Sequence, residues 1–374
     1  MKRRWAILLL ALTMLVGSVG GGRGLPGPAM AAENARLLEY LWYLDTDHQG
    51  PVTVIVRLSE ESAAVHAAAY RDFGQQVAEA ARARQLGRAA RVLGAIWARG
   101  VRATPGLQFE EAYNGFTLTL PAHEIPLLAD VPGITGIFAD VEVVHHRVFP
   151  EDGDHTVDLH YSVDAIEAPA AWAAGYAGAG VLVAILDDGV YTHPHLGGGI
   201  GTGFKVVDEY DFRGLKDDPM PVPGDSHGTH VAATAAGLHG VAPGASILAV
   251  RVLGGSLVNT LGPVMAGIDY AVRMGAHVAN MSLGLQDAFG PVDNPWTEMV
   301  SNAVRAGMVF TNSNGNNGPG YYTVGMYGSS PHAIGVGAVD VRPIPFPRVT
   351  VVEIGAVLVG GYLQRTFSRR APEG

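Results

Sequence analysis

The 374-residue sequence contains no cysteine. This absence excludes disulfide scaffolds, thiolate metal sites and cysteine nucleophiles. Positive charge is also scarce, because 25 lysines and arginines stand against 35 aspartates and glutamates, and the formal net charge is −10. Binding to the phosphates of nucleic acids requires clustered basic side chains, so no nucleic-acid partner is expected. Stability must come from packing, and the 48% hydrophobic content is enough for at least one large core.

The N-terminus has an apolar run that is too short to cross a bilayer. Residues 2–4 are basic, residues 5–16 are apolar, and Ala29 and Ala31 give the small-x-small pattern of a cleavage site. A membrane anchor would need roughly 20 apolar residues. We therefore expect residues 1–31 to be a signal peptide, the protein to be secreted, and no membrane association after the signal is cleaved.

Residues 50–145 have the pattern of a small α+β domain. Apolar and polar residues alternate in the first strand, and Ser59 is a suitable N-cap for the alanine-rich helix that follows. The dipeptide Asn114-Gly115 predicts a tight hairpin between two strands, because both residues tolerate positive φ. The order βαββαβ indicates a ferredoxin-like split sheet with helices on one face. The expected strands are 52–58, 107–113, 116–120 and 134–138, and the expected helices are 60–99, after the N-cap, and 121–129.

Residues 146–161 are polar and are interpreted as a linker to a second domain at 162–340. In this domain continuous apolar runs alternate with helical segments, which indicates α/β architecture: a parallel sheet with helices on both faces. Functional groups in such sheets lie beyond the carboxyl ends of the strands. The expected strands are 181–186, 247–253, 277–283, 308–311 and 333–339, and the expected helices are 227–238, 261–275 and 295–307.

Three polar residues stand at such positions. Asp187 ends the first strand and could orient an imidazole, although Asp-Gly after a strand is also an ordinary turn. His227 opens a helix whose positive end favours the neutral ring, although a single histidine there could be a surface cap. Asn316 follows a strand, and its amide could donate to an oxyanion or could simply belong to an Asn/Gly-rich loop.

Taken together, five segments resemble those of the subtilisin-like protease (subtilase) family, in the family's order across residues 165–340. The chain is most similar to the large extracellular bacterial (Vpr-like) branch. It departs from the usual pattern at Asp188, where Thr or Ser is commoner, and at Ala233, where Gly is usual. The segments are Val-Ala-Ile-Leu-Asp-Asp-Gly-Val at 183–190, His-Gly-Thr-His-Val-Ala at 227–232, Gly-Val-Ala-Pro-Gly-Ala at 240–245, Asn-Met-Ser-Leu-Gly at 280–284 and Ser-Asn-Gly-Asn-Asn-Gly-Pro at 313–319.

The resemblance implies a subtilisin-like fold and a serine endopeptidase that acts on proteins or peptides. His227 would be the general base, Asp187 would orient it, and Asn316 would stabilise the oxyanion. An edge strand would bind the substrate backbone by β-addition. Residues 50–145 resemble the family's inhibitory propeptide, so the protein's own propeptide is an expected partner, and no cofactor is required. The edge strand would consist of Ser282, Leu283 and Gly284.

The family's nucleophilic serine lies in a Gly-Thr-Ser-Met-Ala-x-Pro segment, and no such segment occurs in these residues. Ser368 has the right spacing to Pro372, but Arg369 and Arg370 would then have to enter a buried helix. Residues 341–374 resemble the lead-in to the inserted domain of this branch, which precedes the serine. We therefore expect a truncated precursor that does not cleave peptides alone.

Two other classes of function remain open at this point. A metal-dependent hydrolase could use pairs of histidines and aspartates, although the His-x-x-His helix lacks the glutamate of a zinc protease. A secreted binding or inhibitory protein could use the same edge strand without catalysis. Calcium could bind the acidic stretches at 208–211 and 217–218, although no ligand set follows from their spacing. The residues of the metal hypothesis are His193 and His195, His227 and His230, and Asp187 and Asp188.

Overall fold

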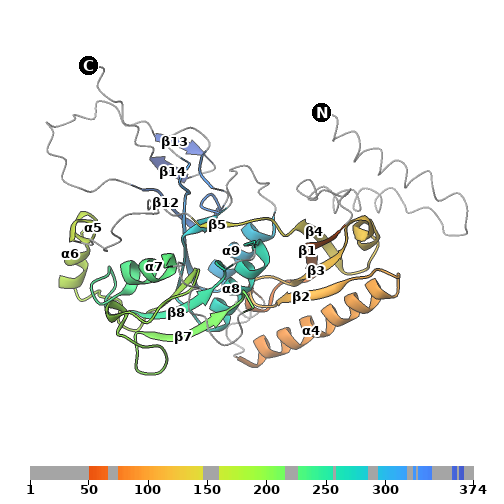
Figure 1. Ribbon diagram of the computed structural model, residues 1–374, viewed down its shortest axis with the longest axis horizontal. Coiled ribbons are helices and arrows are strands. Elements are labelled where there is room, and N and C mark those ends of the chain that lie inside the picture. The colour runs from red at the N-terminus through yellow and green to blue at the C-terminus, as the bar shows by residue number, and fades with distance from the viewer. Residues whose placement is uncertain are drawn as a thin grey trace, which may run out of the picture.

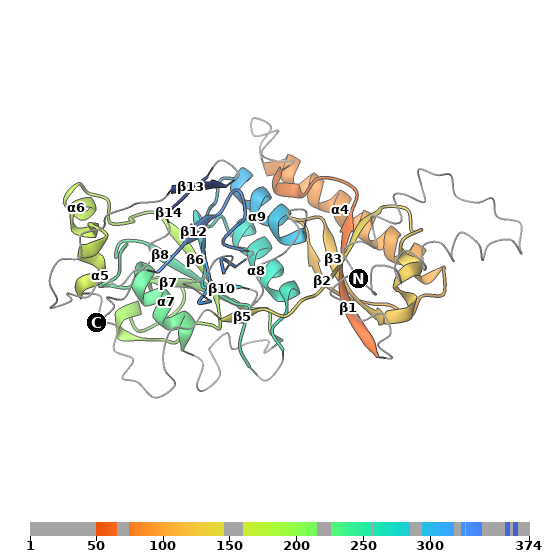
Figure 2. The ribbon, with the colours of Figure 1, turned by 90° about the horizontal axis from the view of Figure 1, so that it is seen from above.

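Two larger sheets with their helices lie side by side in both views of the molecule (Figures 1 and 2), and the described residues also form two sheets of two strands each. The predicted signal peptide, the acidic residues 217–218 and most of the linker and of segment 341–374 fall outside the described residues. No helix among the described residues has the length and apolar character needed to cross a membrane. The computed structural model describes residues 50–65, 75–145, 160–214, 226–255, 258–284, 294–317, 323–325, 327–338, 356–359 and 362–365.

The first sheet is antiparallel and has the strand order β2-β3-β1-β4. Its central strand β1 pairs with both β3 and β4, so the sheet is split as the βαββαβ pattern predicts. A core of its own includes Val54, Leu118 and Ile137 from the sheet and Val92 and Ile96 from α4. The elements are β1 (Pro51–Leu58), α4 (Gln75–Trp97), β2 (Thr104–Phe109), β3 (Gly115–Pro121), the 3-10 helix η2 (Ala122–Leu128) and β4 (Ile134–Ala139).

The predicted tight hairpin at Asn114-Gly115 is wrong. β2 ends at Phe109, residues 110–114 form the connection, and neither Asn114 nor Gly115 has a positive φ. Gly115 is already part of β3, where it pairs with Phe109 and Arg57. A Cβ at this position would overlap the carbonyl oxygen of Val56, so the glycine permits close approach of two backbones rather than a turn.

The second sheet has six strands in the order β12-β11-β9-β6-β8-β7, and every pairing in it is parallel. The strands predicted from the apolar runs are present, with bounds that differ by a few residues. The predicted strand 277–283 ends earlier, because Leu283–Gly284 belongs to a different sheet. The strands are β6 (Leu182–Asp187), β7 (Val206–Asp211), β8 (Ser246–Arg251), β9 (Val278–Met281), β11 (Val309–Ser313) and β12 (Ile334–Val336), and the main helices are α7 (His227–Ala236), α8 (Leu261–Arg273) and α9 (Pro295–Arg305).

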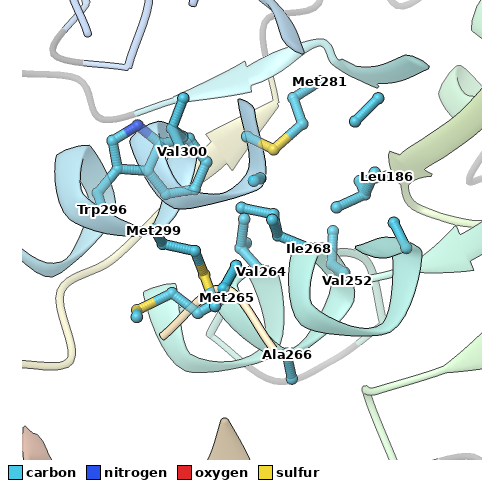
Figure 3. Packing of buried hydrophobic residues seen from close by; sticks show 14 of the residues in the cluster. Leu186, Val252, Val264, Met265, Ala266, Ile268, Met281, Trp296, Met299 and Val300 are labelled. Atoms are coloured by element: carbon cyan, nitrogen blue, oxygen red, sulfur yellow. The ribbon is translucent and has the colours of Figure 1, made fainter. Parts of the chain in front are cut away.

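Consecutive residues of β6 point to opposite faces of this sheet. Ala184 and Leu186 belong to a large core with α8 and α9, whereas Val183 and Ile185 belong to a second core with α7. Because consecutive side chains of a strand point to opposite faces, helices cover both faces, as predicted. Figure 3 shows part of the large core, in which labelled side chains from α8, α9, β6 and β9 lie near one another: Val264, Met265, Ile268, Trp296, Met299, Val300, Leu186 and Met281.

The antiparallel sheet also contributes to the large core. Ile55 of β1 and Phe138 of β4 are buried in it, on the face of the sheet away from α4. The antiparallel sheet therefore has a core of its own with α4, and the parallel sheet has one with α7. The two units share the large core that contains α8 and α9.

A polar contact lies beside this shared core, and we call it the seam. Asp269 of α8 accepts backbone hydrogen bonds from Glu110, Glu111 and Ala112 at 3.0, 2.8 and 2.9 Å. Its side chain is buried, and Arg273 lies 3.4 Å from the Glu111 carboxylate. The loop that replaces the predicted hairpin is thus held by the second unit.

Strand β7 was not predicted from the sequence. The acidic stretch Asp208, Glu209, Tyr210 and Asp211, interpreted as loop charge or a calcium ligand set, is the greater part of this strand. β7 lies at the edge of the sheet, where polar residues can face solvent, so it lacks the continuous apolar run of a central strand. The further elements are β5 (Val144–His145), α5 (His160–Ala165), α6 (Ala168–Ala173), η3 (Pro194–Leu196), β10 (Leu283–Gly284), and the pair β13 (Ala356–Val359) and β14 (Tyr362–Arg365).

Candidate active site

The carboxyl end of β6 carries two consecutive buried aspartates, Asp187 and Asp188, both 0% exposed. The carbonyl oxygen of Asp187 accepts hydrogen bonds from the backbone N–H groups of Val252 and Leu253 at 2.8 and 3.1 Å. The Asp188 N–H donates to Asp187 Oδ1 at 2.8 Å. Backbone N–H groups therefore hold both the main chain and the carboxylate of Asp187 in place.

His227 is the first residue of α7, and its ring faces Asp187. Its Nδ1 lies 2.8 Å from Asp187 Oδ1 and 3.0 Å from Oδ2, and the residue is only 8% exposed. An ionised carboxylate can only accept, so Nδ1 carries the hydrogen, and Nε2 is the proton-accepting nitrogen of the neutral ring. The structure thus brings together the first two residues that the sequence singled out, in the arrangement of a base and its orienting carboxylate.

The carboxylate of Asp188 binds the backbone of the same histidine. It accepts from the N–H of Gly228 at 2.7 Å and from the N–H of His227 at 3.2 Å. Sequence reasoning noted Asp188 as a departure from a family pattern and as a possible metal ligand, and missed this contact. An acidic residue directly after a strand-end aspartate was the only available signal.

The predicted substrate edge is paired with another part of the same chain. Leu283 and Gly284 form β10, which pairs antiparallel with β5 so that Leu283 is opposite His145 and Gly284 is opposite Val144. Just before β5, the Val143 N–H donates to the carbonyl oxygen of Asn259 at 2.9 Å. Segment 141–145 therefore lies between two chain segments, with backbone contacts on both sides. Figure 2 shows β5 beside β10.

Asn316 lies beyond the carboxyl end of β11, and its side chain is exposed. β11 and β6 are separated only by β9, and all three strands are parallel. Asn316 and Asp187 therefore lie at the same end of the sheet, where the parallel strands have their carboxyl ends. The topology thus places the third candidate at the same end of the sheet as the Asp187–His227 pair.

Asn312 is a further polar residue that sequence reasoning missed. It is 1% exposed in β11, and its side-chain NH₂ donates to the carbonyl oxygens of Leu283 and Ser313 at 3.3 and 2.7 Å. This side chain ties the end of β11 to the edge strand β10. An asparagine within an apolar strand was the signal that could have identified it, because buried amides need hydrogen-bond partners.

The described residues give little support for the metal hypothesis. Among them, no group of three or more histidine, aspartate or glutamate side chains is arranged to hold a metal ion. Asp187 and Asp188 point to different parts of His227 rather than toward a common centre. His193 and His195 contact each other edge to face, with ring centroids 5.3 Å apart.

The parallel sheet flanked by helices is consistent with the subtilisin fold, and the aspartate and histidine lie at the carboxyl end of a strand and at the start of a helix. The match to the model of the subtilase family covers residues 178–372, and the chain belongs to this family.

Individual relatives agree with this assignment. The chain is 32% identical over 375 residues to the minor extracellular protease Vpr of Bacillus subtilis, an alignment that covers 95% of the chain and 44% of that protein. It is 34% identical over 186 residues to subtilisin Savinase of Lederbergia lenta, which covers 48% of the chain and 63% of that protein. An alkaline protease of Shouchella clausii is 34% identical over 199 residues, covering 51% of the chain and 48% of that protein. The chain thus spans about half the length of the curated relatives that it matches.

Proposed function

We propose that the protein containing these residues is a secreted serine endopeptidase that hydrolyses peptide bonds in proteins. The observation that carries this proposal is the buried contact of 2.8 Å between His227 Nδ1 and the Asp187 carboxylate. His227 takes the proton from the attacking serine hydroxyl at Nε2. Asp187 holds the ring in the required tautomer and stabilises the imidazolium that results.

The remaining candidate residues have supporting roles in this mechanism. The Asn316 amide donates to the oxyanion of the tetrahedral intermediate, and one such donor is typically worth about 2.7–4 kcal/mol of barrier. Ser282, Leu283 and Gly284 bind the substrate backbone as an added strand. The pairing of β10 with β5 supports this role, because it uses the same backbone groups of Leu283 and Gly284.

Residues 50–145 are proposed to be the inhibitory propeptide. Their sheet packs on α8 and α9 through the shared core, and their last strand β5 occupies the proposed substrate edge. A segment bound there in the manner of a substrate would block access of other peptides. Removal of residues 1–145 would then precede activity.

The nucleophilic serine is proposed to lie outside residues 1–374, because no Gly-Thr-Ser-x-Ala-x-Pro segment occurs within them. Without this hydroxyl, the Asp187–His227 pair has no group to activate, and residues 1–374 alone should not hydrolyse casein. No cofactor is required for the reaction.

The test compares two proteins: residues 1–374 alone, and the whole product of the reading frame that encodes them. We expect the whole product to cleave casein and residues 1–374 alone to leave it intact. His227→Ala in the whole product should lower the rate by roughly 10⁴-fold or more, since the base is lost. His239→Ala, which removes an exposed histidine remote from Asp187, is the matched control and should leave the rate unchanged.

Two results would overturn the proposal. One is cleavage by the whole product that survives His227→Ala. The other is His227-dependent cleavage by residues 1–374, which would place the nucleophile within them.

A further inference from the structure

Helix α7 has no cap of its own at its N-terminus. Ser226 is the N-cap residue, but its side chain makes no capping hydrogen bond. The first backbone N–H groups of an α-helix have no partner within the helix and need an acceptor from elsewhere. In α7 the acceptor for His227 and Gly228 is the carboxylate of Asp188, which comes from the end of β6.

The helix approaches β6 so closely that only glycine fits at position 228. A Cβ at Gly228 would overlap the carbonyl oxygen of Gly189 and would lie 2.9 Å from both Asp187 Cβ and Asp188 Oδ1. The N-terminus of α7 is therefore seated directly on residues 187–189. Two consecutive side chains of one strand end bind His227, Asp187 at the ring and Asp188 at the backbone.

This arrangement changes the electrostatics expected at the histidine. The N-terminus of a helix carries a partial positive charge, which disfavours an imidazolium at the first helical residue. A buried carboxylate placed on those N–H groups offsets that charge and adds a second negative charge near the ring. Asp187 lies on the ring itself, and Arg251, opposite Asp187 in the sheet register, places its guanidinium 3.5 Å from Asp211.

We propose that Asp188 is a positioning residue for catalysis: its carboxylate fixes the backbone of His227 and offsets the positive end of α7, so that the imidazolium formed during the reaction is stabilised. The mechanistic meaning of this inference rests on the proposed function. The charge effect itself can be measured on residues 1–374 without any activity, so its failure is distinguishable from failure of that function.

The experiment measures the titration of each histidine by hydrogen exchange at ring Cε1, followed by mass spectrometry of the peptides. Asp188→Asn keeps the shape of the side chain and removes the charge. Asp188→Thr keeps one acceptor oxygen for the Gly228 N–H and is likewise neutral. The matched control is Asp140→Asn, because Asp140 accepts from the N–H of Gly262 at 2.7 Å in the first turn of α8, away from His227.

We expect both Asp188 variants to lower the titration midpoint of His227 by on the order of one pH unit, because a nearby negative charge is lost. The midpoints of His193, His239 and His332 should stay as in the parent, and Asp140→Asn should leave His227 unchanged. An unchanged His227 midpoint in a folded Asp188 variant would overturn the proposal. If Asp188→Asn does not fold, Asp188→Thr decides the question. Loss of the fold in both would also overturn it, since Asp188 would then be a purely structural cap.

Discussion

The carboxyl end of β6 and the seam at α8 use the same chemistry for different ends. In both regions a buried aspartate accepts several backbone N–H groups from a distant part of the chain. At β6 the acceptor Asp188 binds the backbone of a residue whose ring can titrate, and Asp187 binds the ring. At the seam Asp269 accepts from three backbone N–H groups and lies 3.6 Å from the Arg273 guanidinium, so it links two units and orients no titratable ring. Both aspartates are buried. The regions therefore differ in what the aspartate holds: at β6 it holds a residue whose ring can exchange a proton, and at the seam it holds a loop backbone.

The largest effect that separates the two regions is expected from Asp269→Ala. Three backbone N–H groups would lose their acceptor in a buried place, at a cost of about 3 kcal/mol or more. Amide hydrogen exchange of residues 110–112 should therefore accelerate by roughly a hundredfold or more, since about 1.4 kcal/mol corresponds to a factor of ten. Asp164→Ala, on the exposed surface of α5, is the control and should leave this exchange unchanged. Equal exchange in the two variants would show that the seam does not depend on Asp269.

A smaller effect on stability is expected from Gly228→Ala at the other region. The added methyl group must push α7 away from residues 187–189, which typically costs about 1–3 kcal/mol and displaces His227 from Asp187. The denaturation midpoint in urea should fall. Gly94→Ala in α4 is the matched control, since nothing lies within 4 Å of its added Cβ, and it should raise stability by up to about 1 kcal/mol. A Gly228→Ala protein as stable as the parent would mean that α7 is not held against β6.

The smallest expected effect is the dependence of the seam on pH. Burial raises the pKa of Asp269 from 3.8 to about 7, and the charge of Glu111 acts in the same direction, whereas the hydrogen bonds from Glu110 and Ala112 oppose it. Because the pKa is raised in the folded protein, the stabilisation is fully present below pH 4 and is lost as the pH rises through about 7.

Opening of the seam should therefore increase by roughly tenfold between about pH 6 and 8, measured as amide exchange of residues 110–112 corrected for its intrinsic rate. Asp269→Asn cannot ionise and should remove most of this dependence. Glu110, whose pKa burial also raises, and Arg82 and Arg273, which pair with Glu111, remain as the other charged groups there. An undiminished pH dependence in Asp269→Asn would assign it to those groups.

The sequence predicted the fold well where a strand or helix carries its own signal. The apolar runs of β6 and β8 are continuous because both faces of these strands are covered, and each run lies within a few residues of its strand. β7 was missed because an edge strand can be acidic. The predicted hairpin at Asn114-Gly115 was wrong because the sequence cannot distinguish a glycine required for close backbone approach from a glycine required for a turn.

The site could be predicted only in part, for a related reason. Asp187 and His227 stand in short local motifs, so their meeting across 40 residues of sequence could be inferred from resemblance. The contacts of Asp188 and Asp269 join positions 40 and 158 residues apart without any such motif, and only the packed structure reveals them. Asn316 remains a prediction, since its place at the correct edge of the sheet does not by itself give it a role.

The pairing of β5 with β10 has a consequence for any peptide that would use the same edge. Val144 and His145 are part of the chain, so they compete at an effective concentration in the range of about millimolar, whatever the amount of protein in solution. Dilution therefore cannot release the edge. An outside peptide gains access only after the tether is cut or the strand is pulled away, which makes a covalent event, rather than a binding equilibrium, the natural gate to this surface.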